Sequence, residues 1–155
     1  MRMCRRLALR AVNGLPKGVL YSYGKISKKL GGFSSTRCAI SMGADAVTFI
    51  NDTSISNSRF SFRSDKKVLI SGYTTLRFVV YIAVPASLYQ FGIAESDVQN
   101  PTNSDLVRSE SNTSSGGKTQ TIDVDVSGVS GEYYIAGSRN SANTFTNKIY
   151  EIKLL

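Results

Sequence analysis

The acidic side chains are the first candidates for chemistry, because this 155-residue chain contains no histidine. Without an imidazole base, Ser–His–Asp and Cys–His catalysis are both excluded. Asp123 and Asp125 lie two residues apart, so they share one face of a predicted strand and could ligate Ca²⁺ with loop carbonyls. A solvated strand face explains the same spacing. The other acids fall mostly in predicted loops or on exposed strand faces, so we predict no catalytic residue, metal site or cofactor, and an unrecognised carboxylate pair is the enzymatic alternative.

The two cysteines, Cys4 and Cys38, are too few for a disulfide scaffold. They can form a bridge, but free thiols are the expectation. In the absence of histidine, two cysteines cannot build the usual Cys/His zinc site within one chain.

Tyrosine side chains are the candidates for a sugar site. A sugar offers an apolar C–H face and a fringe of hydroxyls, which an aromatic ring and nearby polar groups can bind. The chain has eight tyrosines and no tryptophan. Strand alternation turns one ring of the Tyr133–Tyr134 pair inward and the other outward. We therefore predict a ligand site from Tyr89, Tyr133 or Tyr134 with Arg139 and Asn140, and packing of these rings in the core or on a sheet face is the alternative.

The positive charge lies at the front of the chain. The net charge is +8, yet residues 1–44 carry nine basic and no acidic residues, and residues 45–155 carry ten basic and eleven acidic ones. We predict a basic leader over 1–17 and one domain over 18–155. The leader is interpreted as an anchoring arm that touches an anionic partner through Arg2, Arg5, Arg6 and Arg10. A solvated leader with incidental charge is the alternative.

The leader does not resemble a signal peptide, because Arg10 interrupts its apolar stretch. No run of about 18 apolar residues follows, so no membrane span is predicted.

After residue 18 the hydrophobic pattern predicts short strands and no helix. The strongest strand covers 75–84 and is apolar on both faces, so we expect it to be central. Residues 88–93 are its expected antiparallel partner, and 65–67 are expected to form a turn. A long polar segment over 95–118 and a terminal alternating strand over 148–155 follow. Eight or nine strands with almost no helix predict an all-β fold: a two-sheet antiparallel β-sandwich, jelly-roll-like.

Several sequence runs resemble β-sandwich domains of tail and tail-fibre proteins from phages and prophages of Gram-positive bacteria. The family patterns are LYNxGxE…GGW, YxTLxF and DVSxxxGxYYI, followed by an apolar terminal strand. The matching runs here are VLYSYG at 19–24, LGGF at 30–33, ISGYTTLRF at 70–78, IDVDVSGVSGEYYI at 122–135 and NKIYEI at 147–152. Lysines replace the acidic residues that usually follow the opening, and Phe33 stands where tryptophan is common.

The resemblance implies a virion structural or adsorption protein: a tail, baseplate or fibre module in the phage particle, made in the host cytoplasm. Its expected partners are other virion subunits, further copies of itself in a homo-oligomer, and host cell-wall polysaccharide. The first alternative is a carbohydrate-binding module, free or detached from a larger enzyme. A nucleic-acid binder acting through the leader is a further alternative, which the neutral body of the chain does not favour.

Overall fold

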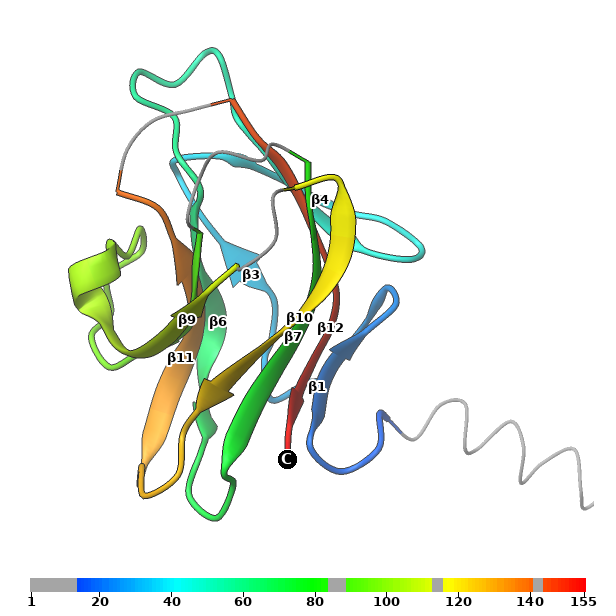
Figure 1. The fold of residues 1–155 in the computed structure, drawn as a ribbon, viewed down its shortest axis with the longest axis vertical. Coiled ribbons are helices and arrows are strands. Elements are labelled where there is room, and N and C mark those ends of the chain that lie inside the picture. Colours follow the sequence, from blue (N-terminus) through cyan, green and yellow to red (C-terminus); the bar gives the residue numbers. More distant parts are fainter. Residues whose placement is uncertain (1–13, 84–88, 113–115, 141–143) are drawn as a thin grey trace, which may run out of the picture.

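The computed structural model describes residues 14–83, 89–112, 116–140 and 144–155 (Figure 1). The predicted arm residues Arg2, Arg5, Arg6 and Arg10 lie outside this part of the chain, as does Cys4. Within it, no helix is long and apolar enough to cross a membrane.

Two antiparallel sheets pack face to face (Figure 1). The seven-stranded front sheet contains β1 (Val19–Ser22), β2 (Lys25–Ile26), β4 (Ala39–Met42), β5 (Val47–Ile50), β7 (Thr75–Ile82), β10 (Lys118–Asp125) and β12 (Thr146–Leu154). The five-stranded back sheet contains β3 (Phe33–Ser34), β6 (Ser61–Leu69), β8 (Gln90–Ala94), β9 (Leu106–Ser111) and β11 (Glu132–Ser138). A 3₁₀ turn, η1 (Asn103–Asp105), precedes β9. The predicted all-β sandwich is confirmed, with twelve strands in the described residues instead of eight or nine.

The order of strands in the front sheet is β10–β7–β12, and β12 then pairs with two shorter strands. Its first half pairs with β5 and its second half with β1. The predictions of a central strand at 75–84 and of a terminal strand over 148–155 are therefore confirmed, and the terminal strand lies inside the front sheet. The predicted pairing of 88–93 with 75–84 is wrong, because β8 pairs with β9 and β11 in the back sheet and β7 pairs with β10 and β12.

The predicted turn at 65–67 is also wrong, since β6 runs unbroken through these residues. Two backbone hydrogen bonds hold the chain extended there. The Asp65 amide donates to the Gly32 carbonyl at 3.0 Å, and the Lys66 amide donates to the Leu30 carbonyl at 3.2 Å. Asp65 also accepts a hydrogen bond from the Ser34 hydroxyl. The segment 30–34 thus supplies hydrogen-bond partners for residues 65–67, and these residues stay extended instead of forming a turn.

The core between the sheets is rich in aromatic rings. Leu76, Phe78, Val80 and Ile82 of β7 point into it and are fully buried, as the alternation of the strand requires. Phe60 lies at its centre, with ring centroids 5.2–5.9 Å from those of Phe49, Phe62, Tyr89, Phe91 and Phe145. This core packs against the inner face of the front sheet.

Candidate functional site

The outer face of the back sheet is partly covered by the chain itself. Ser61 and Ser138 lie on this face, yet both are fully buried. The Ser61 hydroxyl donates to the Pro101 carbonyl at 2.8 Å, and Ser138 donates to the side chain of Asn103. The segment that contains η1 therefore lies against this end of the back sheet (Figure 1).

The outer face of the front sheet has no such cover among the described segments. Because every second residue of β7 is buried, Thr75, Arg77, Val79 and Tyr81 point outward, and all four are half-buried by their neighbours. The strand pairing arranges three cross-strand rows, which are Thr119–Tyr81–Lys148–Thr48, Thr121–Val79–Glu151–Ser22 and Asp123–Arg77–Lys153–Val19. The first row crosses four strands, which at about 4.8 Å per strand gives a width of roughly 14 Å.

Three tyrosines gather on this surface, which we call the tyrosine face (Tyr23, Tyr81 and Tyr150). Tyr81 is paired with Lys148, so Tyr150 occupies the diagonal cross-strand position, where side chains lie roughly 7–8 Å apart. A β-bulge between Ile149 and Glu151 lets Tyr150 and Glu151 both point outward. The Tyr23 ring, 55% exposed, lies 6.1 Å from the Tyr150 ring. The tyrosine face therefore presents three tyrosine side chains on one surface of the front sheet.

The charged groups beside these rings are held in place. Arg77 donates two hydrogen bonds to Asp123, from Nε at 2.7 Å and from Nη2 at 2.6 Å. The hydrogen bonds from Arg77 hold the pKa of the Asp123 carboxyl below its usual value. Lys153 and Glu151 form a second ion pair at 3.2 Å. The face thus offers aromatic rings together with ordered donors and acceptors.

The Arg77–Asp123 pair makes stability at this face depend on pH. A depressed folded-state pKa gives stability that is present above the unfolded pKa of about 3.9 and lost as the pH falls through the folded value. Since both side chains are more than one third exposed, the gain is below about 1 kcal/mol. We expect Asp123→Asn to lower the free energy of unfolding by up to that amount at pH 7 and by nothing at pH 2. Urea titrations at both pH values measure the difference in the free energy of unfolding. An equal loss at pH 7 and pH 2 would mean that the Arg77–Asp123 pair is not the source of the effect.

Asp123 and Asp125 do not form a cation site in this structure. Asp123 is bonded to Arg77, and the Asp125 carboxylate accepts hydrogen bonds from the Ser127 amide at 2.9 Å and hydroxyl at 2.6 Å. In the described part of the chain, no group of three or more Cys, Asp and Glu side chains is placed to hold a metal ion.

The structure does not assemble the predicted ligand residues into one open site. Tyr89 was one candidate platform, but its side chain is 0% exposed and packs edge-on against Phe60, which agrees with the alternative of packing in the core. The guanidinium carbon of Arg139 lies 5.7 Å from the centroid of the buried Tyr89 ring. Asn140 accepts a hydrogen bond from the Asn103 amide at 2.9 Å. The side-chain oxygen of Asn140 is therefore already used in a hydrogen bond to the start of η1.

The expected alternation of the Tyr133–Tyr134 pair is confirmed. Tyr133 packs against the core. Tyr134 points outward from the back sheet, with Arg63 at 4.4 Å and Lys67 at 5.5 Å from its ring centroid. The outward ring of Tyr134 therefore already has two positively charged side chains beside it. Whether these residues bind a ligand stays a prediction.

The sequence interpretation missed Tyr23, Tyr81 and Tyr150. Tyr81 was visible in the alternation of 75–84, but the apolar character of its face was used only to predict that the strand is central. Tyr150 stands in the terminal alternating strand, where the bulge that turns it outward leaves no clear mark in the sequence.

The chain also has a groove at the open edge between the sheets, with a volume of about 460 Å³. Leu20 and Leu154 line it from the front sheet and Val68 from the back sheet. It is separate from the tyrosine face, because these residues point between the sheets.

Comparison with known proteins supports the fold. No family model matches the sequence, and no curated protein does. Two point mutants of CBM29-2, a family 29 carbohydrate-binding module, superpose with TM-scores of 0.55 and 0.53 at 12% and 14% identity, and each alignment covers 88% of this chain and 89% of the other. CBM29_1, a family 29 module from Piromyces equi, gives 0.51 at 13% identity over 88% of this chain and 87% of the other. At these identities the likeness shows a shared β-sandwich fold.

Proposed function

We propose that this chain is a non-catalytic carbohydrate-binding module that holds a glycan on the tyrosine face. The observation that carries the proposal is the uncovered front sheet, on which Tyr23, Tyr81 and Tyr150 stand among ordered charged and hydroxyl side chains. A sugar ring can lay its C–H face on a tyrosine while its hydroxyls bond to neighbouring polar groups.

The polar groups match the chemistry of a polyol. Lys148 next to Tyr81 donates, Glu151 accepts, and Thr48, Thr119 and Thr121 can do both. Because the Arg77–Asp123 and Lys153–Glu151 pairs are already oriented, little side-chain entropy is lost when a ligand arrives. The shared fold with carbohydrate-binding modules supports this function over the virion role that the sequence resemblance implied.

Binding to a panel of purified polysaccharides and Gram-positive cell walls tests the proposal. We expect saturable retention of the full chain on at least one glycan, competed by its soluble oligomer, in affinity electrophoresis and calorimetry. Retention on none of a broad panel of plant, fungal and bacterial glycans would contradict the proposed function.

A further inference from the structure

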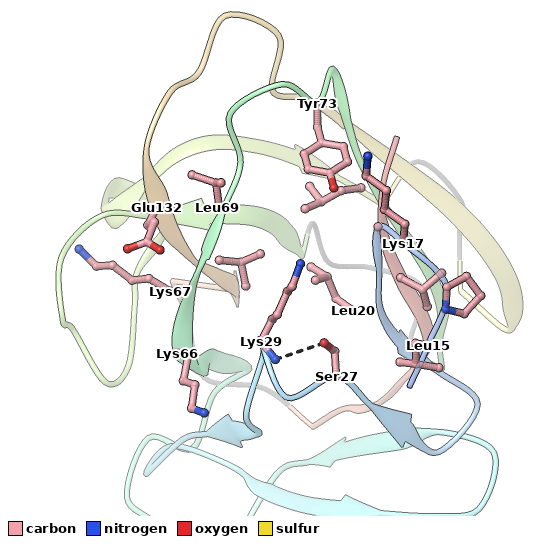
Figure 2. Close-up of a pocket in the computed structure, with 15 residues that line it drawn as sticks. Leu15, Lys17, Leu20, Ser27, Lys29, Lys66, Lys67, Leu69, Tyr73 and Glu132 are labelled. Carbon is pink, nitrogen blue, oxygen red and sulfur yellow. Dashed lines mark hydrogen bonds between the residues drawn. The ribbon is translucent and has the colours of Figure 1, made fainter. Parts of the chain in front are cut away.

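The groove between the sheets has well-defined walls (Figure 2). One wall is the start of the domain up to β1, and the other is the second half of β6. Tyr73, in the hairpin between β6 and β7, closes one end, and the turn that contains Ser27 and Lys29 closes the other (Figure 2). The groove is therefore a bounded trough.

Its floor is apolar and buried. Leu20, Val68 and Leu154 are at most 5% exposed and form its base. Gly18 has φ of +82°, and a Cβ there would lie 2.5 Å from the Leu154 carbonyl oxygen, so the turn before β1 approaches β12 too closely for any other residue. At the far end, the Ser27 hydroxyl accepts a hydrogen bond from the Lys29 amide at 3.2 Å, which orders the turn.

The groove has two lysines that are free to meet a ligand. Its lining contains Lys17, Lys29, Lys66 and Lys67 and one acid, Glu132. The Lys66 ammonium donates to the Lys28 carbonyl at 3.2 Å, and the Lys67 ammonium lies 5.5 Å from the centroid of the outward Tyr134 ring, so Lys17 and Lys29 supply the positive charge of the groove. None of the four lysines forms an ion pair with a carboxylate of the described residues. Figure 2 shows the Lys29 side chain extending into the space between the two walls.

We infer that this groove binds the acidic group of an anionic glycan, a carboxylate or a phosphate, with the attached sugar or polyol on the apolar floor beside Tyr73. The inference deepens the proposed function and rests on it for the sugar part, since it adds a second contact on the same module.

The charges and the shape together favour this ligand. Lysine ammonium groups on flexible stems suit an anion of variable geometry, whether a carboxylate or a phosphate. The Tyr73 ring and the leucine and valine side chains suit the C–H surface of a sugar. A trough of about 460 Å³ accommodates a few sugar units.

Two probes distinguish the sources of the anion: an oligogalacturonate for carboxylate and a glycerol-phosphate polymer for phosphate. A neutral dextran oligomer is the uncharged comparison, and a single-stranded DNA oligomer is the rival anion. We expect one acidic glycan to bind the full chain, with affinity that falls as sodium chloride is raised from about 50 mM to about 300 mM.

The variant Lys29→Glu should weaken that binding at least about tenfold, because it reverses a charge inside the groove. Lys29→Arg should retain most of it. Lys118→Glu, an exposed lysine on β10, is the matched control and should change it less than about twofold. Thermal melting of each variant shows that the fold is kept.

Binding of neither acidic glycan, or equal losses for Lys29→Glu and Lys118→Glu, would overturn the inference. Tighter binding of DNA than of both glycans, lost in Lys29→Glu, would overturn it in favour of nucleic acid. The double replacement of Tyr81 and Tyr150 by alanine should leave the Lys29-dependent binding in place, so a failure of the groove and a failure of the tyrosine face give different results.

Discussion

Replacing Tyr81 and Tyr150 together by alanine should abolish measurable binding of a neutral glycan that the panel identifies, since such a glycan has no acidic group for the groove between the sheets. A ring that buries roughly 50 Å² of apolar surface against a sugar contributes about 1.2 kcal/mol, or about eightfold in Kd. Two rings together therefore account for roughly a sixtyfold change, which takes a weak module beyond detection. Calorimetry with each single variant and with the double variant measures the effect.

The fold offers a matched control for this experiment. Tyr134→Ala also removes a half-buried, outward-pointing tyrosine, but from the back sheet. It should bind the glycan like the unchanged protein. Loss of binding in Tyr134→Ala, with binding kept in the Tyr81 and Tyr150 variants, would place the site on the opposite sheet.

The second large effect concerns the core that supports the tyrosine face. Phe60→Ala should lower the free energy of unfolding by about 3–5 kcal/mol, because it leaves a cavity among five aromatic neighbours. That is a large part of the roughly 5–15 kcal/mol that stabilises a typical domain. Urea denaturation followed by circular dichroism measures the loss.

Phe60→Leu is the control for this substitution, since it keeps most of the buried volume and should cost clearly less. A loss below about 1 kcal/mol for Phe60→Ala would mean that the site collapses around the smaller side chain or is not the centre of the core.

The alternation of apolar residues was enough to predict which side chains face the core. Leu76, Phe78, Val80 and Ile82 are buried as expected, and the Tyr133–Tyr134 pair splits inward and outward. Alternation says nothing about which strand pairs with which, because strands of both sheets have the same period. The pairing of β7 with β10 and β12 depends on contacts between distant segments, and local sequence does not encode these.

The candidate site was harder to predict because a ring's exposure depends on the layer outside its strand. Tyr89, a candidate for the site, is buried in the core, and Tyr81, which was not a candidate, has no second layer over it in the described chain. The groove between the sheets is lined by residues that lie far apart in the sequence, from Leu15 to Leu154. No local sequence motif therefore predicts it. The virion setting, the homo-oligomer and the arm remain predictions from the sequence.

The most direct test of the central claim is an amide-resonance titration of the ¹⁵N-labelled full chain with the retained glycan. Our account predicts shifts that concentrate at the outward-facing positions of β7 and β12, with Tyr81, Tyr150 and their neighbours among the largest and the back sheet unchanged. Shifts confined to the back sheet around Tyr134, or to the loops that join the sheets, would contradict it.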